Sequence, residues 1–427
     1  MDIQDLSRVQ ESFEAFHAHF APTFGRKQWR ERSRDYLQAL LVQNQERCNA
    51  ENLSEVVDAS PRVLQRFLSE ALWDDDAVTD ALQKYLAPRL CHPQAVWAVD
   101  ESGVVKQGKK SAGVAHQYCG AVGKVANSQM GVYLAHIGPR GRAIVDKRLY
   151  LPQEWTEDAQ RCEEAGVPKE ARTYQSKAEL ALGLLKRAHG LGHLQAQWVT
   201  GDDEYGKSPE FREGVKALGL WYMLEVPSNT PVWPVLTLWF TPEAPKRGRH
   251  PKPRPEPSQR QEVGERAAAL PALAWQAITV AEGAQGPRTY LFAFERRRES
   301  RDGEPGEPLG VVYRKNLDGS EARYYFTNAP EDTPADTKAF VAAARWPIET
   351  EFEVNKSHVG LDEYEVRGWQ GWKHHITLCL LASAFLLTLQ QDWGEKAAPD
   401  NAPSSVSGGV RALAAQALDG FRFALVA

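Results

Sequence analysis

The stretch Ala95-Val96-Trp97-Ala98-Val99-Asp100 is a run of apolar residues that closes on an acid. A second stretch of the same kind, Trp198-Val199-Thr200-Gly201-Asp202, lies further along the chain. Short apolar runs of this length predict buried β-strands. An acid after such a run lies where a strand reaches the sheet edge, a common position for active sites in α/β folds. We therefore expect Asp100 and Asp202 at the ends of two strands.

A third acid, Glu349, lies in Arg345-Trp346-Pro347-Ile348-Glu349, which leads into a helical stretch that ends near Lys356. Arg345 lies four residues before Glu349 and Lys356 seven residues after it, so the three share one face if the helix runs through Pro347. Pro347 predicts either a kink or a new helix start. Carboxylates suit Mg²⁺, so three converging acids predict a metal site for phosphodiester chemistry.

Each acid also has an ordinary structural interpretation. The chain has 56 Asp and Glu residues, and most are expected to be simply solvated. Asp100 could end a strand in a turn, Asp202-Asp203-Glu204 could be a polar turn, and the residues around Glu349 could form an exposed ion-pair stripe. Three crowded acids repel one another unless a cation compensates, which favours a metal near Asp202. Of the rivals to Glu349, Glu351 is expected to point elsewhere, and Glu353 lies one turn on.

Length and composition are those of a soluble globular protein. At 427 residues, with 42% hydrophobic and 25% charged residues and a mean hydropathy of -0.49, two or three domains are expected. The formal charge of -5 argues against a protein coated in basic charge, so a nucleic-acid role needs local basic patches. The five cysteines include no CxxC pair and predict neither a zinc site nor a disulfide framework.

Nothing in the sequence predicts export or a membrane span. The first residues lack the basic and then apolar pattern of a signal peptide. The longest apolar stretch, 376–389, is too short for a typical span, and we expect it to be a buried helix. Scattered cysteines fit a reducing compartment, so we expect a cytoplasmic protein without a membrane partner.

Residues 1–92 carry helical periodicity. Within them, Ser60 as N-cap and Pro61 at the first helical position predict a helix start. Two short helices around a tight turn resemble a helix-turn-helix, with Arg62, Gln65 and Arg66 on the second helix. The alternative is an ordinary helical bundle with solvated arginines.

Residues 93–227 predict the first part of a ribonuclease H-like α/β core. The expected order is strands at 95–100, 128–137 and 142–150, a helix at 176–185, a strand at 197–202, a helix near 208–218 and a strand at 221–226. In such a core the first and fourth strands lie side by side and present Asp100 and Asp202 together. We further expect a β-rich insertion at 228–335, the catalytic and C-terminal helices at 336–393, and a linker with a short helix at 394–427.

Two basic segments are candidate DNA contacts. Lys106, Lys109, Lys110 and Lys124 follow Asp100 in a glycine-rich segment, although a solvated lysine loop is an equal alternative. A second cluster contains Lys246, Arg247, Arg249, Lys252 and Arg254, and arginines beside glycine and proline resemble arms that enter the minor groove. Its alternative is a flexible loop with incidental charge.

Four blocks of the sequence resemble the DDE-type transposases of bacterial insertion sequences, most closely insertion sequence family seven-hundred-and-one. The blocks contain 99–103 with 106–114 and Gln117-Tyr118, 149–152 with 165–168, 198–202 with Tyr205-Gly206, and 345–361 with Arg367-Gly368-Trp369. The resemblance implies that Asp100, Asp202 and Glu349 are the catalytic and metal-binding DDE triad, with Arg345 and Lys356 on phosphates. It also implies a tyrosine where this chain has Ala342.

The resemblance implies a mechanism and partners as well. Two Mg²⁺ ions, replaceable by Mn²⁺, would support hydrolysis at the transposon ends and then attack of the freed 3′-hydroxyl on target DNA. The expected partners are double-stranded DNA with terminal inverted repeats, target DNA and a second copy of the chain. One alternative is a transposase-derived DNA-binding protein that no longer cuts. Another, a hydrolase of small phosphoesters, is disfavoured by the helical N-terminal region and the basic loop.

Overall fold

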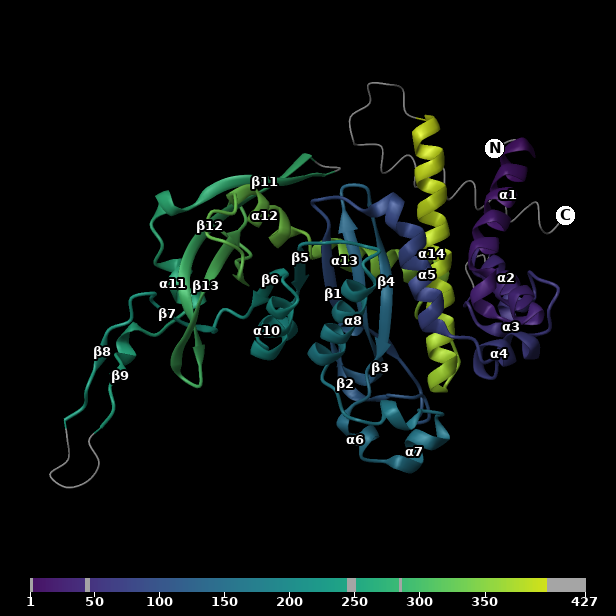
Figure 1. The fold of residues 1–427 in the computed structure, drawn as a ribbon, viewed down its shortest axis with the longest axis horizontal. Coiled ribbons are helices and arrows are strands. Elements are labelled where there is room, and N and C mark those ends of the chain that lie inside the picture. The colour runs from purple at the N-terminus through teal and green to yellow at the C-terminus, as the bar shows by residue number, and fades with distance from the viewer. Residues whose placement is uncertain (1–2, 43–46, 244–250, 284–285, 398–427) are drawn as a thin grey trace. The chain divides into compact units, whose positions relative to one another are not determined.

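The computed structural model describes residues 3–42, 47–243, 251–283 and 286–397. The chain divides into two compact units, which Figure 1 shows in the colours of the sequence. Unit 1 comprises Met1–Ala196 and Trp346–Ala427, and unit 2 comprises Gln197–Arg345. The domain boundaries expected from the sequence stay a prediction, and most of the expected C-terminal linker, together with its helix, falls outside the described residues.

Unit 1 combines helices with an antiparallel group of strands (Figure 1). Its helices are α1 (Ile3–Phe20), α2 (Lys27–Val42), α3 (Ala50–Ser54), α4 (Pro61–Ser69), α5 (Asp75–Leu90), α6 (Gln153–Thr156), α7 (Ala159–Glu164), α8 (Lys177–Leu191), α13 (Trp346–Val359) and α14 (Trp369–Ala397). Its strands are β1 (Val96–Val105), β2 (Ala115–Cys119), β3 (Lys124–Gly138) and β4 (Gly141–Leu149). β3 pairs antiparallel with β1, β2 and β4.

Two helices cover opposite faces of these strands. Trp97 of β1 faces α8, because its ring lies 6.4 Å from that of His189. Tyr133 of β3 faces α13, because its ring lies 5.2 Å from that of Phe352. Side chains alternate between the faces along a strand, and residues directly opposite each other in a pair share a face. The side of each β1 residue therefore follows from its number.

The predicted helix start at Pro61 is confirmed. α4 begins at Pro61 with Ser60 as N-cap, although the Ser60 side chain makes no capping hydrogen bond. Pro61 suits the first helical position for two reasons. Its fixed φ is helical, and an N–H at this position would have no partner within the helix, so proline loses nothing by lacking one. α4 buries Leu64 and Phe67 and leaves both of its arginines exposed.

The predicted buried helix at 376–389 is confirmed within α14. In the described part of the chain, one helical segment, Trp369–Asp392, is long and apolar enough to cross a membrane, but 78% of its most apolar window is buried inside the protein. α14 packs against α2, α4, α5 and β4. It is therefore the central core helix of unit 1.

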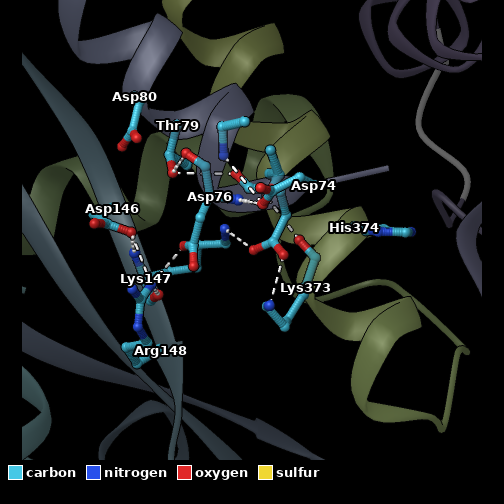
Figure 2. Close-up of polar contacts among 12 residues, drawn as sticks. Asp74, Asp76, Thr79, Asp80, Asp146, Lys147, Arg148, Lys373 and His374 are labelled. Atoms are coloured by element: carbon cyan, nitrogen blue, oxygen red, sulfur yellow. Dashed lines mark hydrogen bonds and ion pairs between the residues drawn. The ribbon is translucent and has the colours of Figure 1, made fainter. Parts of the chain in front are cut away.

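A charged network joins α5, β4, α8 and α14, and Figure 2 shows its part around Lys147 and Lys373. Asp75 accepts hydrogen bonds from the ammonium groups of Lys147 and Lys373, both at 2.6 Å. Lys147 is fully buried, and the preceding residue along β4, Asp146, faces the other way and accepts a hydrogen bond from Arg187 of α8 at 2.6 Å. Alternation along β4 thus sends neighbouring opposite charges to opposite faces of the strands, and each finds a partner on a different helix.

Unit 2 carries a large mixed sheet. Its strands are β5 (Trp198–Gly201), β6 (Trp221–Val226), β7 (Pro231–Trp233), β8 (Trp239–Phe240), β9 (Arg254–Pro255), β10 (Gln261–Glu262), β11 (Gln276–Gly283), β12 (Gly286–Arg301), β13 (Glu304–Lys315) and β14 (Arg323–Thr327). Its helices are α9 (Asp203–Gly206), α10 (Pro209–Ala217), α11 (Val263–Ala268) and α12 (Ala335–Ala343).

The strand order within unit 2 is β10-β7-β12-β13-β14-β6-β5, with β11 also on β12 and with β8 and β9 in a separate pair. β5 and β6 are parallel, whereas the other pairs are antiparallel. Strands predominate in the described residues between 228 and 335, as the sequence predicts. The short helix α11 was not expected there.

Candidate active site

Asp100 lies in the middle of a strand. β1 runs from Val96 to Val105, so the prediction that a strand ends at Asp100 is wrong. The strand continues because residues up to Val105 keep pairing with β3, and because Gly103 leaves room for buried sulfur atoms. A Cβ at Gly103 would lie 2.5 Å from the sulfur of Met130. The apolar run ends at Asp100, but the backbone pairing between β1 and β3 continues to Val105.

The Asp100 side chain is buried, with 8% exposure. Its Oδ1 accepts a hydrogen bond from the Glu101 N–H at 2.8 Å. Asp100 stands directly opposite Tyr133 in the β1–β3 register, so its side chain shares the face that α13 covers. Burial of a carboxylate in a strand interior costs free energy unless the charge is paired or binds a metal. This burial distinguishes Asp100 from an acid in an exposed turn.

Glu349 lies in the first turn of α13, the helix that covers this face. α13 packs against β1, β3 and β4, and Phe352, three residues after Glu349, makes the ring contact with Tyr133. Residues three apart lie on neighbouring positions of a helix surface. Unit 1 therefore brings the helix that bears Glu349 onto the strand pair that bears Asp100. Glu349 is half-buried.

The helix that carries Glu349 begins at Trp346, with Pro347 next to it, so the prediction of a new helix start is confirmed. The condition for a shared face of Arg345, Glu349 and Lys356 is not met, because Arg345 lies in the turn before α13. Arg345 forms an ion pair with Glu225 at 3.4 Å. Glu349 and Lys356 both lie within α13, seven residues apart, and so share a face.

The rivals of Glu349 have other environments. Glu351 is buried and pairs with Arg142 of β4 at 2.5 Å, so it does point elsewhere, as expected. Glu353 is exposed. The Glu351–Arg142 pair is a second link between α13 and the strands, and it fixes the helix that carries Glu349.

Asp202 follows β5 directly, which confirms the second predicted strand end. It is the N-cap of α9, and its side chain accepts from the Glu204 N–H at 3.0 Å. Gly206 closes this turn against β6, where a Cβ would lie 1.8 Å from the carbonyl oxygen of Glu225. The polar-turn interpretation is thus correct for the backbone. The capping hydrogen bond uses one carboxylate oxygen of Asp202, Oδ1, and not the other.

Sequence reasoning missed the partner of Glu101. Glu101 follows Asp100 on β1, and its carboxylate accepts a hydrogen bond from Lys177 Nζ at 2.7 Å. Lys177 is the first residue of α8, after the N-cap Ser176. Both side chains are mostly buried, with exposures of 18% for Lys177 and 17% for Glu101. The adjacent acid was visible in the sequence, but its lysine lies far along the chain.

The predicted DNA contacts divide by environment. Lys106 turns inward, because its Nζ donates to the Tyr364 carbonyl at 2.7 Å and lies 3.5 Å from the Tyr364 ring centre. Burial lowers the pKa of Lys106 to about 8, although Asp362 and Glu365 work in the opposite direction. The residues exposed at the surface are Arg62, Arg66, Lys109, Lys110, Lys124, Lys252 and Arg254. Lys246, Arg247 and Arg249 lie outside the described residues.

Comparison with known proteins shows the family of the chain. The sequence profile described as "DDE superfamily endonuclease" matches residues 19–287. The chain belongs to the DDE superfamily endonucleases. The matched region contains Asp100 and Asp202 and ends before Glu349.

Among solved structures, the piggyBac transposase synaptic complex with hairpin DNA is similar, at 12% identity and a TM-score of 0.41. The alignment covers 92% of this chain and 73% of that one. No curated protein matches the chain. The narrower likeness to insertion sequence family seven-hundred-and-one stays a prediction for this endonuclease-family chain.

Proposed function

We propose that this protein is a DNA transposase that cuts the ends of its element and transfers them into target DNA, with Asp100, Asp202 and Glu349 as its DDE triad. Membership of the endonuclease family supports the reaction class. The observation that carries the assignment of residues is the packing of α13 over the Asp100–Tyr133 pair through Phe352. It supplies a reason for two acids far apart in sequence to act together.

The donor set fits a hard divalent cation. All three proposed ligands are carboxylates, and Glu101 offers a further carboxylate beside Asp100. Oxygen ligands suit Mg²⁺ and Mn²⁺, and sulfur or imidazole ligands are not part of the set. A bound divalent ion would activate a water or hydroxyl nucleophile and offset the charge that develops on the phosphate.

The residues of the chain supply orientation and charge. The Glu101 N–H fixes the rotamer of Asp100 through its bond to Oδ1. Lys356, on the same face of α13 as Glu349, is suited to contact a backbone phosphate two helical turns away. We assign Arg345 the same role, a contact with a backbone phosphate, because it lies one residue before α13.

The proposal includes the ribonuclease H-like arrangement, in which the strand before Asp202 lies beside the strand of Asp100. The order β1, β3, β4, α8 and β5 supports it, and so does the short connection of residues 192–197 between α8 and β5. Two Mg²⁺ ions, a homodimer on DNA and a cytoplasmic location belong to the same proposal.

Substitutions that keep side-chain shape test the triad. Asp100→Asn keeps the acceptor for the Glu101 N–H, and Asp202→Asn keeps the N-cap of α9. Together with Glu349→Gln, each should abolish cleavage of element ends in Mg²⁺ or Mn²⁺ while the protein still binds those ends. Matched controls are Asp203→Asn and Glu353→Gln, which are exposed acids beside the second and third members. Wild-type cleavage in any triad variant would remove that residue from the site.

A DNA-binding protein that no longer cuts is the second candidate, because Ala342 replaces the tyrosine that the resemblance implies. Ala342 is buried in α12 and offers no polar group to DNA. The wild-type protein, incubated with its element ends and Mn²⁺, separates the two candidates. Shifted but intact DNA would favour the silent protein, whereas nicked ends favour the transposase.

A further inference from the structure

The segment between Glu101 and Asp146 contains no acidic residue, although acids outnumber Lys and Arg in the whole chain by 56 to 51. The segment contains β2, β3 and the loop that joins β1 to β2. Its cations are Lys106, Lys109, Lys110, Lys124, Arg140 and Arg142. The segment itself therefore carries only positive charge, although the whole protein is acidic.

Near the middle of this segment, the β2–β3 hairpin exposes apolar side chains. Tyr118 and Val125 stand directly opposite each other and are 62% and 64% exposed. Val122, in the turn between the strands, is 43% exposed. Behind them, Cys119 and Met130 are buried, so the hairpin has a packed side and an open apolar side. β2 is the last strand in the sheet order.

The loop between β1 and β2, which contains Lys106, Lys109 and Lys110, is hydrogen-bonded to this hairpin. The Asn127 side-chain amide donates to the carbonyls of Lys106 and Gly108 at 2.6 and 2.9 Å, and the Lys106 N–H donates to the Asn127 carbonyl at 2.9 Å. Arg161, stacked on the Trp155 ring at 3.9 Å, donates to the Lys109 carbonyl at 3.2 Å. Lys109 is therefore held beside the hairpin by its backbone.

The three exposed lysines of this region are open to a ligand. Among the residues that the structure describes, Lys109, Lys110 and Lys124 form no ion pair with an acid, and all three are exposed. Lys124 stands opposite Cys119, one step from Tyr118. The hairpin thus presents an apolar surface flanked by cations whose charges are not neutralised by neighbouring carboxylates.

We propose that the β2–β3 hairpin is a DNA-distorting element. Its three lysines contact the phosphates on either side of a minor groove, and Tyr118, Val122 and Val125 insert between base pairs. The inference rests on the proposed function, because it takes DNA as the ligand. Positive charge around an apolar wedge matches the surface of DNA, where apolar side chains unstack a base step and cations hold the backbone. A protein partner would need an acidic and apolar surface instead.

The register places the distortion relative to the reaction. Val125 and Tyr133 both lie on β3, eight residues apart, and Tyr133 stands opposite Asp100. Eight residues of strand span about 27 Å, which is the length of about eight base-pair steps. A duplex that follows β3 would therefore be unstacked about eight steps from the bond at which Asp100 acts.

Fluorescence of 2-aminopurine in a synthetic duplex tests the proposal, since the base brightens when its stack opens. The full-length wild type should raise the fluorescence on binding, and Tyr118→Ala with Val125→Ala should lose that rise. Replacement of Lys109, Lys110 and Lys124 by Gln should weaken binding on the order of tenfold at low salt and lower the salt slope by about 2 to 3. Leu317→Ala, an exposed apolar residue of unit 2, is the matched control and should change nothing.

The outcomes separate the two proposals. If the Tyr118 and Val125 variant keeps the fluorescence rise with a wild-type circular dichroism spectrum and melting temperature, the wedge is rejected. A change of oligomeric state without any change in fluorescence would make the hairpin a protein interface and would also reject it. Wild-type cleavage without a fluorescence rise would reject the wedge and leave the transposase intact. In a duplex that the wild type cuts, the response should peak about eight steps from the cut, and a peak elsewhere would reject that placement.

Discussion

The ring of Phe352 lies 5.2 Å from the ring of Tyr133, edge to face at 70°. Tyr133 stands opposite Asp100 in the strand register, and Phe352 follows Glu349 by three residues. One aromatic contact therefore links the strand of the first acid to the helix of the third. Edge-to-face pairs have a preferred geometry, so the contact fixes the orientation of α13 as well as its distance.

Phe352→Ala should separate stability from catalysis. Loss of this nearly buried ring should lower the free energy of unfolding by about 3 kcal/mol, because a cavity remains beneath α13. End cleavage should fall by at least roughly tenfold at temperatures where the variant is still folded, because Glu349 is no longer held over β1. DNA binding should change little. Urea denaturation, end cleavage and end binding measure the three effects.

Phe352→Leu is the matched control for that experiment. Leucine fills most of the volume and keeps the helix over Tyr133, so most of the cleavage activity should return. If Phe352→Ala cleaves as fast as the wild type while it is clearly less stable, the contact is only structural. The position of α13 would then have no part in catalysis.

The fold could be predicted from the sequence wherever a local pattern decides the structure. The runs before Asp100 and Asp202 predicted strands, and Pro61 and Pro347 predicted helix starts, because each depends on neighbouring residues only. β2 was missed because its five residues, Ala115–Cys119, are too few and too polar to form a clear alternating pattern. Its existence depends on pairing with β3.

The site was less predictable for the same reason. The end of the apolar run suggested a strand end at Asp100, but strand length is decided by pairing with β3. Lys106 was a candidate DNA contact, yet its ammonium group donates a hydrogen bond to the carbonyl of Tyr364, which lies far away in sequence. Arg345 looked helical from its spacing to Glu349, but the helix begins after it. Each of these outcomes depends on tertiary contacts that spacing does not contain.

Gly206→Ala should destabilise the turn that carries Asp202. A Cβ there would lie 1.8 Å from the Glu225 carbonyl oxygen, which is backbone of β6 and cannot rotate away. We expect a loss of roughly 2 kcal/mol or more, with α9 displaced from β6. Thermal denaturation measures the loss. Gly183→Ala, where the added methyl group meets no atom within 4 Å, is the control and should be neutral or stabilising.

Two buried histidines should make the protein sensitive to mild acid. Burial lowers the pKa of His17 to about 4, and burial likewise lowers the pKa of His375 to about 4. The unfolded chain takes up these protons near pH 6.5, whereas the folded chain resists until about pH 4. Stability from these groups is therefore complete above pH 6.5 and is lost as the pH falls towards 4.

The loss should amount to roughly 2 kcal/mol per histidine between pH 6.5 and pH 5, read from urea denaturation at several pH values. His17→Phe should make the dependence on pH shallower, because one titrating group is gone. His19→Phe is the matched control, since His19 is exposed two residues away. An unchanged slope in His17→Phe would show that its burial is relieved before the protein unfolds.

Asp75→Asn should be among the most damaging single changes in unit 1. Burial opposes ionisation of Asp75, but the charges of Lys147 and Lys373 outweigh it and hold the pKa of this carboxyl well below its usual range. Removal of the carboxylate leaves two ammonium groups, one of them fully buried, without their counter-charge. We expect a loss of about 3 to 5 kcal/mol at neutral pH.

The sign of the pH dependence follows from the same shift. A folded pKa below the unfolded value means that the stabilisation from Asp75 is complete above about pH 4 and is lost as the pH falls below it. The stability of Asp75→Asn should therefore be flatter than that of the wild type in this acid range. Asp74→Asn is the matched control, because Asn keeps the N-cap of α5 on an exposed residue. Lys373→Met in the Asp75→Asn background should restore part of the stability, since it removes one of the unbalanced charges. If Lys373→Met gives no such recovery, the damage comes from lost hydrogen bonds and not from uncompensated charge.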